Sequence, residues 1–320
     1  MTPLLTAAAV LLAVLLCLAW DRTRGAGRAG LVAAAVLSVV AAVAAQLNQI
    51  TVAVPWPPAG SSSATGSRVV TVTVRGALTL RMAVYLPAGY DRGDLRYPVI
   101  EALHGYPGSP RSWLRMLSAQ SYLDTEIAAG RMAPTVVLFP WQTPNTFHDT
   151  ECVNLRGGPQ AETFLTVDVP AYARAHLRVR TDRAGWALTG YSAGGFCAIN
   201  LGLRHPGEYA AAAALTGYAA PGITVGDGSE DTTNNPGWRL THLPPPDLAL
   251  WLGWAADDRD AARDSRRLAA AARPPLLVTT AVLARGGHSS AVWREMEPPA
   301  FDWLSAHLAR PVPGRLPASR

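Results

Sequence analysis

The sequence predicts an α/β protein with a mainly parallel, doubly wound sheet, preceded by an N-terminal transmembrane helical hairpin. Short apolar runs alternate with helical stretches after Leu95, and this βαβ order requires parallel strands with helices on both faces. The pentapeptide Gly190–Gly194 follows one such run, and two long apolar runs fill the first 50 residues. The 320 residues therefore divide into a membrane region (1–50), a linker (51–66), a globular domain (67–310) and a flexible tail (311–320).

The first 50 residues contain two segments long enough to cross a bilayer. Residues 4–20 and 29–47 are almost entirely apolar, and each is close to the roughly 20 residues that a membrane span needs. The loop between them carries three arginines, which by the positive-inside rule keep it in the cytoplasm. Everything after the second span is then extracytoplasmic. Two alternatives are a cleavable signal peptide, which the uncharged start Met1-Thr2-Pro3 disfavours, and a second segment that lies on the membrane surface or in a protein core.

The chain after the second span predicts a tether and then the start of a sheet. Residues 55–66 are rich in Pro, Gly and Ser, a composition typical of flexible linkers. Alternating residues at 69–74 and 78–85 predict an antiparallel hairpin. Apolar runs at 98–103 and 135–139 predict the first strands of the parallel part.

The stretch Gly190-Tyr191-Ser192-Ala193-Gly194 has the pattern of a nucleophile elbow. The run 185–189 before it predicts a strand, and residues 195–204 after it predict a helix. A serine on so sharp a strand-to-helix turn needs small neighbours, because its backbone is strained and the helix packs close to the sheet. Ser192 is therefore the candidate nucleophile.

Two later loops supply partners for such a serine in the order acid, then histidine. The apolar run 248–254 predicts a strand and is followed by Asp257 and Asp258. The run 276–283 predicts another, and it leads into a glycine loop that carries His288. We expect His288 to be the general base and Asp258 to orient it, with Asp257 as the alternative acid.

A serine nucleophile of this kind needs an oxyanion hole built from two backbone amides. The residue after the nucleophile, Ala193, supplies one amide, and a loop after an earlier strand supplies the other. The loop 104–108 follows the strand at 98–103, and Tyr106 is the residue whose amide we expect to contribute. His104 in the same loop is expected to organise it by hydrogen bonding rather than to react.

Three short motifs precede the elbow: Leu86-Pro87-Ala88-Gly89-Tyr90, Tyr97-Pro98-Val99 and Leu103-His104-Gly105. With the elbow, they resemble the motifs of the esterase family that includes S-formylglutathione hydrolases and secreted mycolyltransferases, and the stretch 162–166 is similar to the mycolyltransferase branch. The resemblance covers most of the chain after Ser67. It implies an α/β-hydrolase fold in which Ser192 is the nucleophile, His288 the base, and the amides of Tyr106 and Ala193 the oxyanion hole.

The resemblance implies a serine hydrolase that acts on carboxylic esters through an acyl-enzyme, and the two predicted spans make it membrane-anchored and extracytoplasmic. One alternative is an acyltransferase that passes the acyl group to a sugar or lipid hydroxyl, and a peptidase is less favoured. A tethered binding protein without activity is the alternative from another class. The mycolyltransferases have an aspartate at the turn of His104 and a glutamate as the triad acid, so their specificity for trehalose and mycolate does not carry over.

The chain has three cysteines. Cys17 lies in the first predicted span. Cys152 follows the strand predicted at 135–139, and Cys197 lies in the first turns of the helix after Ser192. Cys152 and Cys197 are the two cysteines of the predicted extracytoplasmic domain. An even number of thiols in an oxidising compartment favours a disulfide between them, with two separate buried cysteines as the alternative.

Composition limits the partners. The formal net charge is +5 and the sequence contains no lysine, but its arginines are spread along the chain and do not predict a nucleic-acid surface. No phosphate-binding glycine loop or metal-ligand spacing predicts a cofactor or metal. Residues 219–247 predict a long loop that contributes to the substrate-binding wall, and the proline-rich end 311–320 predicts an unstructured tail.

Overall fold

The computed structural model describes residues 61–62 and 66–314, all of which belong to one compact unit, Pro57–Arg320. Both predicted membrane spans, the arginine loop between them and Cys17 lie outside the described residues. Within the described ranges, no helix combines the length and the apolar character that a membrane span requires.

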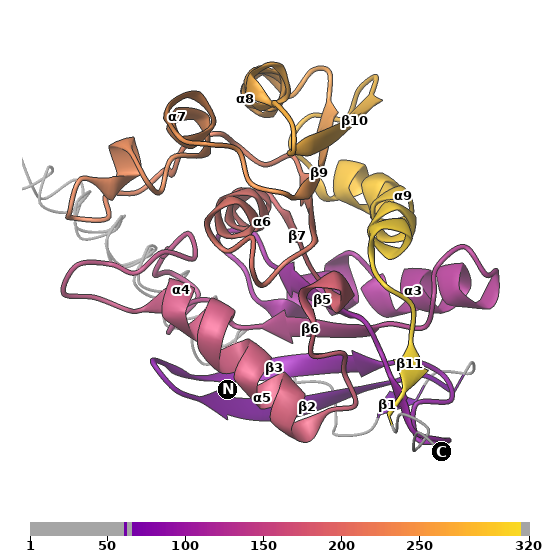
Figure 1. Cartoon of the computed structure of the whole chain (residues 1–320). Coiled ribbons are helices and arrows are strands. Elements are labelled where there is room, and N and C mark those ends of the chain that lie inside the picture. Colours follow the sequence, from indigo (N-terminus) through magenta and orange to yellow (C-terminus); the bar gives the residue numbers. More distant parts are fainter. Residues whose placement is uncertain (1–60, 63–65, 315–320) are drawn as a thin grey trace, which may run out of the picture. The chain divides into compact units, whose positions relative to one another are not determined.

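The described chain is built on a nine-stranded sheet (Figure 1). The six strands from β6 to β10 in the spatial order are parallel, and β1, β2 and β3 extend the sheet in antiparallel fashion. The predicted mainly parallel sheet is therefore confirmed, with a very short edge strand added. In spatial order the strands are β1 (Ser61–Ser62), β2 (Arg68–Arg75), β3 (Thr79–Leu86), β6 (Val136–Pro140), β5 (Val99–Leu103), β7 (Trp186–Tyr191), β8 (Ala211–Leu215), β9 (Ala249–Ala255) and β10 (Leu277–Leu283).

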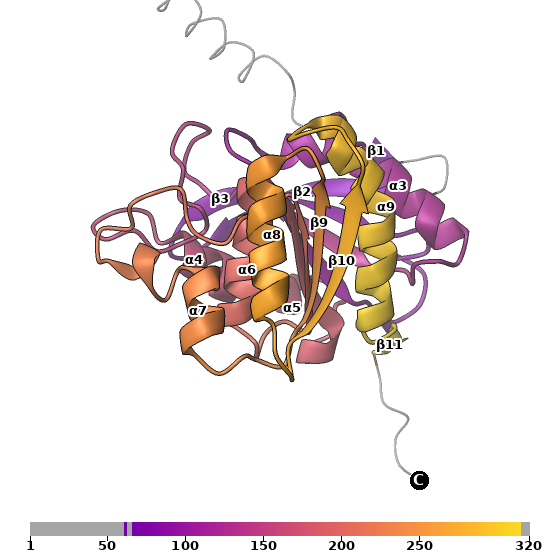
Figure 2. The ribbon, with the colours of Figure 1, turned by 90° about the horizontal axis from the view of Figure 1, so that it is seen from above.

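Helices cover both faces of the sheet, as a doubly wound arrangement requires (Figure 2). The helices α3 (Ala119–Ala128) and α9 (Ser290–His307) pack against each other on one face. On the other face lie α6 (Ala193–Arg204), α7 (Pro236–His242) and α8 (Arg259–Ala271). The remaining helical segments are α4 (Ala161–Thr163), α5 (Val169–His176), π-helical turns at Ser112–Met116 and Phe164–Asp168, and 3-10 turns at Arg183–Gly185 and Ser229–Asp231.

The structure adds one strand that the sequence analysis did not identify, and it changes one predicted loop. The stretch Ala211–Leu215 forms β8, although four of its five residues are alanines, which favour helices. It is a strand because it is fully buried between β7 and β9, where tertiary packing outweighs local preference. The segment predicted as a loop at 219–247 contains α7, which begins at Pro236 and is capped by the Asn235 side chain accepting from the Trp238 amide at 2.9 Å.

Short strands also occur inside the predicted linker and tail. Ser61 and Ser62 of the linker range pair with the start of β2. At the other end, β11 (Val312–Pro313) pairs with β4 (Leu95–Arg96) in a separate two-stranded sheet, so the tail range starts with paired backbone. Both differences have the same reason, since an edge strand offers free backbone groups to any neighbouring segment.

The parallel strands bring distant loops to one edge of the sheet. Their carboxyl ends lie side by side, because Leu103 of β5 pairs with Gly190 of β7 and Leu215 of β8 pairs with Gly253 of β9. Open α/β sheets bind their ligands at this edge. The loops that follow the six parallel strands therefore meet there.

Candidate active site

Ser192 lies on the turn between β7 and α6. Its backbone angles are φ 55° and ψ −122°, a region that residues with a side chain rarely adopt. The Ser192 amide donates a hydrogen bond to the Leu215 carbonyl at 3.0 Å, which ties the turn to the neighbouring strand. This is the strained turn expected from the sequence.

Glycines on either side of Ser192 allow backbones to approach closely. A Cβ at Gly190 would lie 2.0 Å from the Gly194 carbonyl oxygen, and a Cβ at Gly194 would lie 2.2 Å from the Leu103 carbonyl oxygen. A side chain at Gly190 would therefore push α6 away from β7, and one at Gly194 would push α6 away from the end of β5. The small residues around the serine are needed for this packing.

Ser192, His288 and Asp258 form a continuous hydrogen-bonded chain. The His288 Nε2 atom is 2.8 Å from the Ser192 Oγ, and its Nδ1 atom is 2.7 Å from Asp258 Oδ2. Asp258 is buried, with 8% of its surface exposed, whereas 40% of the His288 side chain is exposed. A carboxylate that accepts from Nδ1–H leaves Nε2 free to accept the serine proton.

The two adjacent aspartates have different partners. Asp258 contacts the imidazole and also accepts from the Ala261 amide at the start of α8. Asp257 instead accepts from the amides of Gly287 and Gly286, at 2.9 and 3.2 Å. These two bonds lower the pKa of Asp257 and hold the loop that carries His288.

Trp293 packs against the edge of the histidine ring. The ring centroids of His288 and Trp293 are 5.3 Å apart at an interplanar angle of 87°. The Trp293 indole N–H donates to the Thr216 hydroxyl at 2.8 Å, and Thr216 is a buried residue with a positive φ at the end of β8. Trp293 therefore supports the imidazole.

The loop 104–108 lies directly against the elbow. A Cβ at Gly105 would be 2.7 Å from the Tyr191 ring and 3.2 Å from the Ser192 Cβ. Within residues 66–314, neither the Tyr106 amide nor the Ala193 amide donates to another protein group. Both amides are therefore available to a ligand oxygen, and their joint action as an oxyanion hole stays a prediction.

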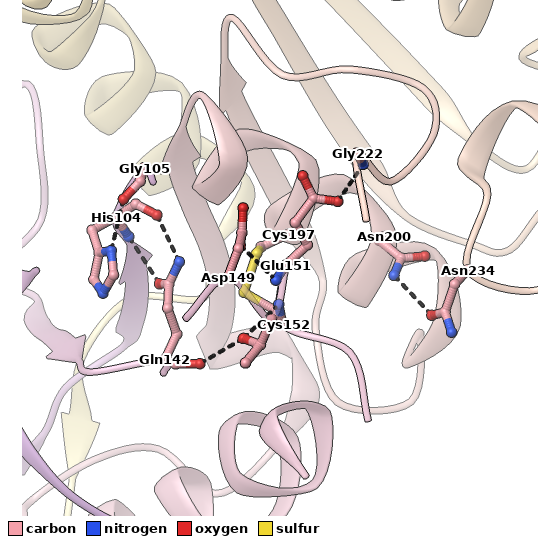
Figure 3. The surroundings of a disulfide bond; sticks show 11 residues. His104, Gly105, Gln142, Asp149, Glu151, Cys152, Cys197, Asn200, Gly222 and Asn234 are labelled. Atoms are coloured by element: carbon pink, nitrogen blue, oxygen red, sulfur yellow. Dashed lines mark hydrogen bonds between the residues drawn. A yellow bond between two sulfur atoms is a disulfide. The ribbon is translucent and has the colours of Figure 1, made fainter. Parts of the chain in front are cut away.

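His104 and Gln142 fix the conformation of this loop (Figure 3). The Gln142 side chain accepts from the His104 amide at 2.9 Å and donates to the His104 carbonyl at 2.6 Å. The His104 ring hydrogen-bonds through Nδ1 to the Gly105 carbonyl at 2.9 Å. Burial lowers the pKa of His104 to about 4, so the ring is neutral at pH 7. His104 thus organises the loop, and Gln142, which the sequence did not single out, assists it.

Cys152 and Cys197 are joined by a disulfide, with their Cα atoms 5.6 Å apart (Figure 3). Cys152 belongs to the segment after β6, and Cys197 lies on α6, which starts right after Ser192. The bond therefore connects a loop at the active edge to the helix that follows the nucleophile.

Two residues at this edge escaped the sequence analysis. The Tyr218 hydroxyl lies close to both the Ser192 side chain and Glu151. Tyr218 stands three residues beyond β8, so the missed strand also hid its position at the active edge. Glu151 directly precedes Cys152, and the disulfide was the only signal that could have drawn attention to it.

The arrangement suits nucleophilic acyl chemistry. It combines an activated hydroxyl, an imidazole oriented by a carboxylate, and free backbone amides beside the hydroxyl. Over the described ranges 61–62 and 66–314, no three His, Cys, Asp or Glu side chains are grouped as metal ligands would be.

Known proteins show the same fold over most of the chain. A solved ferulic acid esterase superimposes with a TM-score of 0.65 at 20% identity and covers 76% of this chain and 99% of its own. An S-formylglutathione hydrolase from Agrobacterium tumefaciens has a TM-score of 0.64 at 16% identity, over 78% of this chain and 98% of its own. These likenesses establish the α/β-hydrolase fold.

Sequence comparison gives the family. An uncharacterized protein of Corynebacterium glutamicum is 26% identical over 238 residues, which are 69% of this chain and 56% of that protein. The match thus spans little more than half of that relative's length. The profile of the esterase family matches residues 78–307, which is well over half of the chain, and it confirms the resemblance inferred from the sequence motifs. The chain therefore belongs to the family described as "Putative esterase".

Proposed function

We propose that this protein is a membrane-anchored, extracytoplasmic serine hydrolase that cleaves carboxylic esters through an acyl-enzyme. The observation that carries the proposal is the chain of 2.8 and 2.7 Å contacts from Ser192 through His288 to Asp258. Family membership and the fold support ester substrates.

Acylation begins with the Ser192 hydroxyl. His288 removes its proton through Nε2 as the oxygen attacks the ester carbonyl, and Asp258 stabilises the imidazolium that forms. The amides of Tyr106 and Ala193 donate to the oxyanion of the tetrahedral intermediate. His288 then gives its proton to the departing alcohol, and the acyl group stays on Ser192.

Deacylation repeats these steps with water as the nucleophile. A sugar or lipid hydroxyl in place of water would make the enzyme an acyltransferase, as in the mycolyltransferase-like alternative. His104 is buried and bonded to Gly105 rather than open to an acceptor, which favours hydrolysis. Product analysis with and without a sugar acceptor distinguishes the two outcomes.

The proposed location rests on the first 50 residues and on the disulfide. Disulfides persist in oxidising compartments and are rare in the cytosol. The bond between Cys152 and Cys197 therefore supports export of the domain.

Replacing the nucleophile tests the activity. Ser192→Ala should abolish turnover of p-nitrophenyl esters and labelling by a fluorophosphonate reagent, because no other oxygen is bonded to His288 Nε2 within the described chain. Ser289→Ala is a matched control in the same loop as His288, and we expect it to keep labelling. A wild-type protein that the reagent does not label would favour the non-catalytic binding protein, and full activity of Ser192→Ala would mean that another residue is the nucleophile.

A further inference from the structure

The triad leaves one contact of the nucleophile without a role. The Tyr218 hydroxyl lies close to both Ser192 and Glu151. Its ring is stacked on Phe196 of α6, with centroids 5.7 Å apart and planes 14° from parallel. The helix that follows the serine thus holds the Tyr218 ring, and the hydroxyl lies beside a carboxyl group.

Glu151 is itself firmly placed. It is buried, with 4% of its surface exposed, and its Oε2 atom accepts from the Gly222 amide at 2.6 Å. Its own amide donates to Asp149 Oδ1 at 3.0 Å (Figure 3). The titratable groups that face Glu151 are Asp149 and Tyr218, and His148 faces Asp149. No cation is among the groups that act on Glu151 in the described chain, so it is not half of an ordinary ion pair.

The backbone around Glu151 is unusual as well. Glu151 and Cys152 both have positive φ angles, 39° and 58°, which cost energy for residues with side chains. The disulfide fixes this turn to Cys197 on α6. A strained turn, a covalent link and a buried carboxyl therefore converge beside the nucleophile.

We propose that Tyr218 donates a hydrogen bond to the alcohol oxygen of the ester at Ser192, and that Glu151 is the positioning residue that directs the Tyr218 hydroxyl toward it. This inference rests on the proposed ester hydrolysis and adds to it a residue that acts on the departing group. Tyr218 transfers no proton. As the bond between the acyl carbon and the alcohol oxygen breaks, the proton comes from His288, and Tyr218 stabilises the charge that develops on that oxygen.

The protonation state of Glu151 decides how Tyr218 points. A tyrosine has one hydroxyl proton to donate. When Glu151 is protonated it donates to the Tyr218 oxygen, which leaves the Tyr218 proton for the substrate. When Glu151 is ionised it takes that proton as an acceptor. Burial and the Asp149 carboxylate raise the pKa of Glu151 to about 7, and burial also raises the pKa of Tyr218, so both states of Glu151 occur near neutral pH.

The first test compares two esters of one acid. An ethyl ester has a poor leaving group that needs a hydrogen bond, whereas p-nitrophenolate leaves without one. We expect Tyr218→Phe to lower kcat/KM on the ethyl ester by about 10- to 100-fold, and on the p-nitrophenyl ester by less than about threefold. Using kcat/KM isolates acylation. Equal losses on both esters, or no loss on either, would overturn the inference.

A matched control is available two residues before β8. Tyr209 donates to the buried Glu101 at 3.2 Å, so it forms a similar tyrosine–carboxyl pair that the triad does not include. Tyr209→Phe should leave the ratio of the two kcat/KM values unchanged. If Tyr218→Phe keeps p-nitrophenyl activity that Ser192→Ala lacks, the proposed function stands whatever the outcome for the ethyl ester.

The second test separates positioning from mere structural support. The ratio of ethyl to p-nitrophenyl kcat/KM cancels every pH effect that the two substrates share, and in the wild type it should fall as pH rises through about 7. Glu151→Gln keeps a donor for the Tyr218 oxygen at every pH, so the ratio should stay high and flat. A flat ratio in the wild type, or the same fall in Glu151→Gln, would show that Glu151 does not direct Tyr218.

Discussion

Neighbouring residues of one type have separate tasks at this site, as Asp257 and Asp258 show. We expect Asp258→Asn to lower kcat by about 10³- to 10⁴-fold, because the amide no longer orients the imidazole or stabilises its charge. Asp257→Asn loses acceptor strength toward Gly286 and Gly287 only, and should lower kcat by less than about tenfold. Steady-state hydrolysis of a p-nitrophenyl ester measures both. A greater loss in Asp257→Asn would reverse the assignment of the acid.

The buried Glu151 should also make stability depend on pH. Its pKa is about 7 in the folded chain against 4.5 as the ordinary value, so between these pH values the folded state binds more protons. The free energy of unfolding then falls as pH rises from about 4.5 to about 7, by up to ~3 kcal/mol, and levels off above. Urea unfolding at pH 5 and pH 8 should show this fall in the wild type and a smaller one in Glu151→Gln.

Glu162 provides a control of opposite sign. It is also buried, but the side chains of His205 and Arg204 bond to it and lower its pKa. Its contribution to stability is present above the ordinary pKa and is lost as pH falls. Glu162→Gln should therefore reduce the loss of unfolding free energy that the wild type shows as pH falls below the ordinary pKa of a glutamate. A fall in the free energy of unfolding between pH 5 and pH 8 that is as large in Glu151→Gln as in the wild type would contradict the placement of Glu151.

At the scale of elements, the disulfide joins the segment after β6 to α6 across 45 residues of sequence. Closing a loop of this size in the unfolded chain corresponds to about 4 kcal/mol of stabilisation. We expect the double variant Cys152→Ser/Cys197→Ser to unfold at a clearly lower temperature than the wild type, as should the wild type in reductant. Reductant should have no effect on the double variant. Equal melting temperatures for the oxidised wild type and the double variant would show that the bond carries no stability.

Elements with a strong local signal could be predicted from the sequence. The elbow around Ser192 needs small residues at fixed positions, and the strands before Asp258 and His288 are long apolar runs. Elements that depend on tertiary packing could not. The alanine run of β8 favours a helix by local preference, and it forms a strand only because it packs between two buried strands. Because β8 was not identified, the position of Tyr218 after its end was not identified either. The count of thiols favoured a disulfide between Cys152 and Cys197, but only the fold shows that their Cα atoms are close enough, 5.6 Å apart.

At the scale of the whole molecule, chain order and topology together explain why the candidate site could be assembled in advance. Parallel strands end at one edge, so residues 96 positions apart, such as Ser192 and His288, meet once their strands are recognised. The membrane region offers no such check, because it lies outside the described residues. Its two spans stay a prediction.

Reporter fusions at the C-terminus test that prediction on the full chain. Two spans with a cytoplasmic arginine loop place everything after residue 50 outside the cytoplasm. In bacterial cells, an alkaline phosphatase fusion should therefore be active and a green fluorescent protein fusion dark, with both in the membrane fraction after carbonate extraction. A fluorescent and phosphatase-inactive pair would place the domain in the cytoplasm.

The tight packing of the elbow has a consequence for adapting the protein. Gly190 and Gly194 set the position of Ser192 through contacts with main-chain atoms rather than with variable side chains. Main-chain packing therefore anchors the nucleophile. The side chains of Tyr106, Glu151 and Tyr218 can be varied in a library while these main-chain contacts are kept, which makes this scaffold a starting point for selecting new ester preferences.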